Sequence, residues 1–246
     1  MTPRCDRRGV LAVVFAASSA LGACSDGNGT PRDATPDMPI DTMCGAAAFF
    51  TGDIIDWDST DAKFCGVYNS KLTVFGQTSP ADTSRPNGRF ELCVPRQALT
   101  EVDVMHGANQ SQCTMPAGVY PVRAVLFAEQ AVIDAGGRFS ARAMTQQRQD
   151  DMFTAIGAAY NPARAQLVVH VDGAQRQVSI SAAAVHDTTQ KFDGAAWAAG
   201  DTGSDVFFPN VDPGTVQITV AGNAVGSGVS VALAAGAYTY VAVRAN

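Results

Sequence analysis

The sequence predicts an all-β protein with two tandem antiparallel β-sandwich domains joined by a short helical connector. Short runs rich in aromatic and β-branched residues recur along its 246 residues, and clusters of Gly, Pro, Asn and Asp separate them. One stretch near the middle lacks these features and is rich in Ala, Gln, Arg and Met. The predicted segments are a signal peptide (1–23), a disordered tether (24–43), a first sandwich (44–135), the connector (136–162) and a second sandwich (163–246).

Residues 1–23 have the pattern of a bacterial signal peptide. Three arginines precede an apolar run from Val10 to Leu21. At about 12 residues, this run is shorter than the roughly 20 that a membrane-spanning helix needs. An uncleaved anchor helix is the alternative, but the polar stretch SDGNGTPRD follows at once.

The motif Leu21-Gly22-Ala23-Cys24 resembles the lipobox of bacterial lipoproteins. An ordinary secretory signal also ends in small residues, but the cysteine favours the lipoprotein. The resemblance implies cleavage before Cys24, a diacylglyceryl thioether on its sulfur, and fatty acids such as palmitate at the anchor. Two or more acyl chains hold a protein firmly on its membrane. Ser25, rather than an aspartate, follows the cysteine, which favours the outer membrane of the cell envelope.

The segment after Cys24 predicts a tether, and the net charge of the chain argues against nucleic acid as a partner. Residues 25–42 are rich in Pro, Gly, Asp and Thr, with little apolar content to pack on a fold. The net charge is −6, and it becomes more negative when the basic leader is removed. An acidic chain of this kind has no electrostatic basis for binding nucleic acid.

The first sandwich is expected to hold four to seven short strands. Alternation is clear in 71–75 and 89–94, where apolar residues fall at every second position. After Gly118, one or two further strands are expected, or a return strand that ends near Ile133. The runs that predict strands are AAAFFTGDIIDWD, GVYNSKLTVFGQT, GRFELCVP, TEVDVMHGA and VYPVRAVLFAEQAVI.

Four cysteines remain once Cys5 leaves with the leader and Cys24 takes the lipid. An even number in an exported chain predicts two disulfides. All three pairings are possible, and proximity in sequence favours 44–65 with 93–113. Zinc is the rival interpretation, but the spacing lacks a Cys-x-x-Cys knuckle. The four residues are Cys44, Cys65, Cys93 and Cys113.

The connector and the second sandwich follow. One helix is expected over about 145–159, ended by Asn161 because a residue before proline avoids the α conformation. Six strands are then expected, with a hairpin after Gly173 and a long loop over 187–205. Their runs are AQLVVHVDG, RQVSISAAAV, SDVFFPNVDPG, TVQITVAG, SVALAAG and YTYVAVRA.

The segment TGDIIDWDSTDAKFCGVYNSKLTVFGQTSPADTSRPNGRFELCVP resembles the carboxypeptidase regulatory-like (transthyretin-like) family. Its features are an acidic turn after the first strand, a Gly-Val…Leu-Thr-Val strand, and then Asn-Gly-x-Phe-x-Leu. The resemblance covers about residues 46–108, with a more diverged copy over 165–245. It implies a seven-stranded module that supports folding or binding and carries no chemistry of its own.

The sequence carries no recognisable set of catalytic residues, metal site or cofactor motif. A zinc carboxypeptidase needs two histidines and a carboxylate on one metal, but His106, His170 and His186 form no such motif. Neither a Gly-x-Ser-x-Gly elbow nor a phosphate-binding loop is present. We therefore expect no enzyme.

The turn after the first strand carries alternating carboxylates and resembles a calcium-binding loop only in part. An EF-hand needs a glycine at its sixth place and a glutamate at its twelfth. Counted from Asp56, those places hold Asp61 and Val67, so a polar loop without calcium is favoured over a cation site. The carboxylates concerned are Asp53, Asp56, Asp58 and Asp61.

Two tryptophans are the candidate ligand-binding residues. Trp57 and Trp197 are expected in loops, where they would stack on sugar rings or instead fold back over the core. The predicted function is a lipid-anchored cell-envelope protein with a non-catalytic binding or structural role. Alternatives are a carbohydrate-binding module using these tryptophans, and a scaffold subunit that docks an envelope protein through a strand edge.

Overall fold

The computed structural model describes residues 44–60, 62–106, 124–136, 139–181, 184–222 and 228–245. These residues belong to one compact unit, Met38–Asn246. The predicted signal peptide, the tether, Cys24, Asp61 and Cys113 lie outside the described residues.

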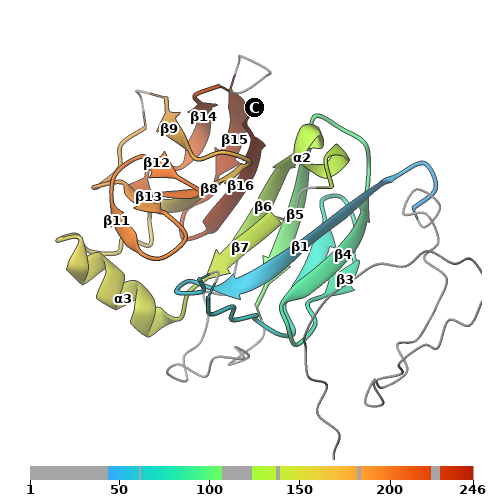
Figure 1. The fold of residues 1–246 in the computed structure, drawn as a ribbon, viewed down its shortest axis with the longest axis horizontal. Helices are drawn as coiled ribbons and strands as arrows, with labels where there is room; N and C mark the ends of the chain where they lie inside the picture. The colour runs from blue at the N-terminus through green and yellow to red at the C-terminus, as the bar shows by residue number, and fades with distance from the viewer. Residues whose placement is uncertain are drawn as a thin grey trace, which may run out of the picture. The chain divides into compact units, whose positions relative to one another are not determined.

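The prediction of a mainly β protein is confirmed (Figure 1). The first strands are β1 (Ala48–Asp56), β2 (Lys71–Val74), β3 (Asp82–Thr83), β4 (Arg89–Val94), β5 (Leu99–Met105), β6 (Ala124–Glu129) and β7 (Phe139–Ala143). The later strands are β8 (Ala165–Asp172), β9 (Arg176–Ile180), β10 (Gln190–Phe192), β11 (Trp197–Ala199), β12 (Thr202–Gly203), β13 (Asp205–Val211), β14 (Gly214–Val220), β15 (Val229–Leu233) and β16 (Tyr238–Arg244). The helices are α2 (Gln130–Asp134) and α3 (Gln146–Ala155).

One nine-stranded sheet runs through both predicted domains, in the order β11-β10-β13-β8-β16-β6-β5-β2-β3. Its key strand is β16, which lies between β6 and β8 and pairs parallel with both (Figure 1). Tyr238 thus pairs with Ala124 of the first region and Gln166 of the second. The expected division into two separate sandwiches at 44–135 and 163–246 is therefore not confirmed, because the last strand joins both regions.

Two cores lie on opposite faces of this sheet. Neighbouring residues of one strand point to opposite faces, so Leu126 belongs to one core and Val125 to the other. The small sheet β4-β1-β7 and helix α3 contribute to the first core, and strands β9, β14 and β15 of the sheet β12-β9-β14-β15 contribute to the second. The central strands are accordingly buried on both faces, as β6 and β16 show along almost their whole length.

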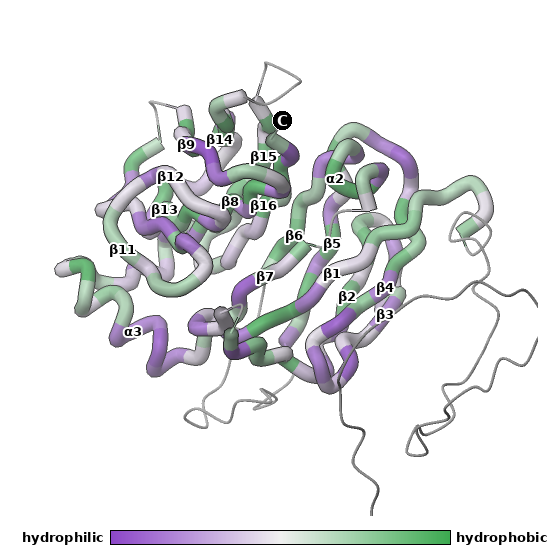
Figure 2. Tube along the Cα trace, in the orientation of Figure 1, coloured by the Kyte–Doolittle hydropathy of each residue, from purple (hydrophilic) through white to green (hydrophobic). Residues whose placement is uncertain are grey.

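Helix α3 is confirmed but is shorter than expected. The side chain of Thr145 caps it by accepting a hydrogen bond from the backbone N–H of Arg148. It ends before Gly157, whose φ of 69° is the left-handed conformation that terminates helices. Figure 2 shows the hydrophilic start of this helix, which carries the sequence QQRQDD.

Three local expectations are wrong. Strand β7 occupies the predicted helical connector and pairs parallel with β1. The chain leaves the central sheet after β8, so β9 pairs with β14 and β12 and forms no hairpin with β8. The strand expected to end near Ile133 is β6, which ends at Glu129, and helix α2 follows and buries Val132 and Ile133.

The disulfide pairing favoured by proximity in sequence is also wrong. Cys44 is bonded to Cys93, 49 residues away. The antiparallel register of β1 and β4 explains this, because Phe49 lies opposite Cys93 and the chain before β1 turns back towards it. Cys65 is also disulfide-bonded.

Replacing Cys44 and Cys93 together with alanine should lower the free energy of unfolding by about 2–4 kcal/mol, since the bond restricts the unfolded chain. Urea denaturation measures this loss. Peptide mapping without reduction should recover a Cys44–Cys93 peptide, and recovery of a Cys44–Cys65 peptide would contradict the pairing.

A pocket between two regions of the chain

A pocket of about 310 Å³ opens between the end of β1, strand β7 and the second region. Its walls come from segments far apart in the sequence, so it forms only when these segments fold together. Polar groups line it alongside an aromatic wall. The residues that matter for its chemistry are Ser59, Ser140, Arg142, His170, Phe192 and Asp205.

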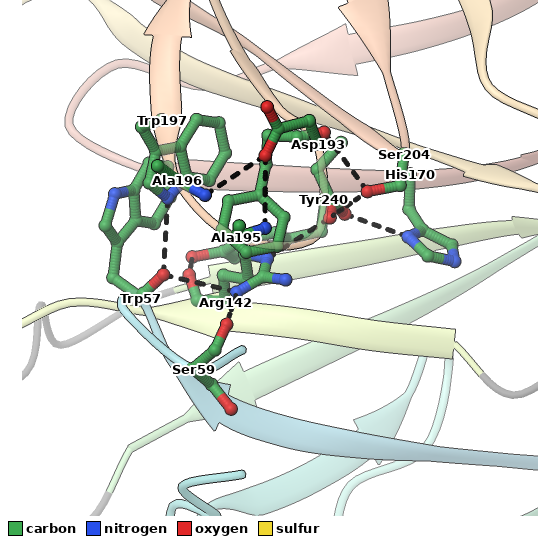
Figure 3. A network of polar contacts seen from close by, with 12 residues as sticks. Trp57, Ser59, Arg142, His170, Asp193, Ala195, Ala196, Trp197, Ser204 and Tyr240 are labelled. Atoms are coloured by element: carbon green, nitrogen blue, oxygen red, sulfur yellow. Dashed lines mark hydrogen bonds and ion pairs between the residues drawn. The ribbon is translucent and has the colours of Figure 1, made fainter. Parts of the chain in front are cut away.

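Arg142 lies at the centre of the polar contacts (Figure 3). Its Nε donates to Oδ2 of Asp205 at 3.2 Å. Its Nη1 donates to the carbonyl oxygens of Trp57 at 3.2 Å and Ser59 at 2.7 Å. The guanidinium also lies over the ring of Phe192, 3.8 Å from its centroid, in a cation–π contact. One buried side chain thus connects the end of β1 with β10 and β13.

Asp205 balances this charge and orients a histidine. Its Oδ1 lies 2.8 Å from Nδ1 of His170, the residue opposite it in the β8–β13 ladder. Burial alone would raise the pKa of the Asp205 carboxyl, but the charges and hydrogen bonds of His170 and Arg142 outweigh it, and the pKa lies below its usual range. Asp205 is therefore ionised at neutral pH.

Three groups of the pocket keep hydrogen-bonding capacity. Figure 3 shows the remaining guanidinium nitrogen of Arg142, Nη2, on the side away from Trp57 and without a dashed line. Within the described part of the chain, Nη2 has no hydrogen-bond partner, and neither have Nε2 of His170 and the hydroxyl of Ser140. These groups can therefore bind a polar ligand.

The two tryptophans meet each other instead of solvent. Trp57 lies in the turn after β1 and is fully buried, so of the two alternatives it folds back over the core. Its ring stacks on Trp197 with centroids 4.3 Å apart and planes 9° from parallel, and the edge of Phe207 closes it from another side. Trp197 is half-buried in β11 and also contacts Phe192. Neither tryptophan presents an open ring face on which a sugar ring could stack.

The acidic turn uses its carboxylates within the protein. Asp53 is buried in β1, and Oδ1 of Asp56 accepts from the backbone N–H of Asp58 at 3.1 Å. Asp58 binds Arg148 through both carboxylate oxygens, at 2.7 and 2.9 Å. Among the residues the structure describes, no group of three His, Cys, Asp or Glu could hold a metal ion.

The three histidines make different contacts and do not form a common site. Nδ1 of His106 lies 3.0 Å from the hydroxyl of Ser70, and Nδ1 of His186 lies 2.7 Å from the carbonyl of Asp187. His170 alone among them lines the pocket described above.

Sequence reasoning missed Arg142, Asp205 and the role of His170. The sequence contained a clue to these residues, because each lies within or next to a strongly apolar strand. Charged side chains are seldom fully buried unless they are paired, so an arginine inside a strand and an aspartate directly before Val-Phe-Phe predict a buried pair.

The stability of the fold should depend on pH through the ionisation of the Asp205 carboxyl. Its folded pKa is depressed, so it stabilises the fold above its unfolded pKa of about 3.9 and loses this effect as the pH falls through the folded value. At pH 5, Asp205→Asn should unfold about 3 kcal/mol more easily than the wild type, because it leaves Arg142 uncompensated. Urea denaturation at lower pH should show the difference narrowing. A difference that stays constant through the acid range would contradict this assignment.

No protein-family model matches the chain, and no curated protein matches it significantly. No helix among the described residues is long and apolar enough to cross a membrane.

Proposed function

We propose that this chain is a lipid-anchored protein of the bacterial cell envelope that binds a small ligand without transforming it. The observation that carries the ligand-binding role is the pocket between β1, β7 and the second region, on whose wall three polar groups have no hydrogen-bond partner among the described residues. The motif ending at Cys24 supports the anchor, and paired cysteines support an exported chain.

We further propose that the two regions are carboxypeptidase regulatory-like modules. Each small sheet packs on a different face of the central sheet, which supports two carboxypeptidase regulatory-like modules that share a sheet. Modules of this kind would serve as a rigid frame, since β6 and β16 are buried on both faces. The pocket lies between segments of both modules, which this frame holds in place.

The His170–Asp205 pair favours binding over nucleophilic catalysis. A histidine oriented by a carboxylate is one half of the arrangement that activates a serine or cysteine in hydrolases. Such an enzyme also needs a hydroxyl or thiol bonded to the free ring nitrogen. In the described segments, no Ser, Thr or Cys side chain is hydrogen-bonded to Nε2 of His170, so the pair orients a ligand-binding group in this proposal.

The anchor is tested by mass spectrometry of the native N-terminus and by Cys24→Ser. We expect a lipid-modified Cys24 as the first residue, and the serine variant should leave the detergent-rich phase on phase partition. An unmodified Cys24 or an intact Met1 would refute the anchor.

Ligand binding is tested by calorimetric titration of the full chain with a panel of neutral and charged monosaccharides. Ser140→Leu is the blocking variant, because the larger side chain fills the pocket. Ser179→Ala, on an exposed position of β9, is the matched control. At least one compound should bind the wild type and the control but not Ser140→Leu. Binding that is equal in all three, or absent for every compound, would overturn the proposal.

A further inference from the structure

We propose that the pocket selects a small organic carboxylate, with a sugar acid as the size that fits. This inference rests on the ligand-binding function proposed above and adds the chemical class of the ligand. Four properties of the pocket support it: the remaining donor of Arg142, the hydrogen-bonding groups beside it, the volume and the charge at the rim.

Arg142 is buried and permanently charged. Its side chain is only 7% exposed, and a guanidinium can lose no proton to escape burial. Its Nε donates a hydrogen bond to Asp205, and its Nη1 donates to two backbone carbonyl oxygens. Nη2 has no protein partner in the described part of the chain, and the strongest acceptor it can meet is an anionic oxygen.

Two further polar groups of the pocket, on Ser140 and His170, accompany the guanidinium of Arg142. The hydroxyl of Ser140 can donate to a second ligand oxygen, and β7 carries it two residues from Arg142. Nε2 of His170 accepts a hydrogen from a ligand hydroxyl when Nδ1 donates to Asp205. A ligand with a carboxylate and neighbouring hydroxyl groups satisfies all three positions at once.

The volume of the pocket limits the size of the ligand. Pockets for small ligands measure about 300–1,000 Å³, and this one, at about 310 Å³, lies at the lower limit. Phe64 and Phe192 line it and offer apolar surface to the carbon skeleton of a ring. A monosaccharide fits this description better than a longer chain.

The charge of Asp193 distinguishes a carboxylate from a phosphate. Asp193 also lines the pocket, and the backbone N–H groups of Ala195 and Ala196 hold the pKa of its carboxyl below the usual range. This negative charge repels a dianion more than a monoanion. Since a phosphate group carries about −1.5 to −2 at neutral pH, the pocket favours the carboxylate.

The experiment compares three probes of different charge: D-glucuronate, D-glucose and inorganic phosphate. The full chain holds two tryptophans, and both contact Arg142, one through its carbonyl and one through its ring. Their emission therefore reports binding at this residue. We expect D-glucuronate to bind at least about tenfold more tightly than D-glucose, from the added charge-assisted hydrogen bond, and phosphate to bind more weakly than D-glucuronate.

Two variants test the donor of Ser140 and the acceptor of His170 without removing Arg142. Ser140→Ala removes the hydroxyl, and His170→Asn keeps a donor near Asp205 while removing Nε2. Each should weaken D-glucuronate binding about fivefold or more, by the loss of one hydrogen bond, whereas Ser179→Ala should not. Urea midpoints close to that of the wild type show that the variants fold.

The outcomes separate this inference from the function it rests on. If D-glucose binds as tightly as D-glucuronate, the carboxylate selectivity is wrong and the pocket still binds a ligand. If phosphate binds most tightly, the carboxylate class is likewise wrong. If other neutral monosaccharides bind and D-glucuronate does not, the inference fails alone, and if no compound of the monosaccharide panel binds, both fail.

Discussion

Replacing Arg142 with alanine is expected to lower the free energy of unfolding by about 3–5 kcal/mol, because it leaves the buried Asp205 carboxylate without its cation. It also removes the donors to the carbonyl groups of Trp57 and Ser59. Buried polar groups that lose their partner cost more than the hydrogen bond itself contributed. Urea denaturation followed by circular dichroism measures the loss.

The control is Arg148→Ala. This arginine also forms a two-point ion pair, with Asp58, but the side chains are 29% and 53% exposed. Exposed pairs of this kind contribute about 0–1 kcal/mol. If Arg142→Ala and Arg148→Ala destabilise the protein equally, the buried network is not what connects β1 to β13.

Replacing Trp57 with alanine should destabilise the protein by about 3–5 kcal/mol, as other large-to-small changes of buried aromatic residues do. The substitution leaves a cavity beside Trp197 and Phe207, which lose their stacked and edge contacts. Differential scanning calorimetry of the variant measures the effect. We expect Trp57→Phe to be milder, because the buried Nε1–H of Trp57 has no hydrogen-bond partner among the described residues.

Phe75→Ala is the matched control for this prediction. Phe75 is 67% exposed, so its removal should change the free energy of unfolding by less than about 0.5 kcal/mol. A Trp57→Ala variant as stable as Phe75→Ala would contradict the burial of Trp57 and restore its candidacy as a surface ligand-binding residue.

The strands were largely predictable from local sequence. Arg89–Val94 and Gly214–Val220 alternate apolar and polar residues, and their side chains alternate between buried and less buried positions in the structure. Helix α3 was predictable because its segment lacks turn residues, although Gly157 ends it early. These features depend on residues close together in the chain.

The way in which the strands assemble was not predictable from local patterns. The parallel pairing of β16 with β6 joins residues more than 110 positions apart, as Tyr238 with Ala124 does. One hint was present: the apolar runs of β6 and β16 do not alternate, and such runs are typical of strands buried on both faces. The disulfide and the pocket depend on the same long-range register, so proximity in sequence misassigned the first and missed the second.

Both regions must form one folded unit, because only then do β1, β7, β8 and β13 enclose the pocket. Urea denaturation of the full chain, followed at once by tryptophan emission and far-ultraviolet circular dichroism, tests this unity. Tryptophan emission reports the contact of Trp57 with Trp197, between the two regions, and circular dichroism reports all strands. We predict one transition with the same midpoint for both signals. A second transition in circular dichroism, at which tryptophan emission does not change, would show two independent domains and contradict the single folded unit.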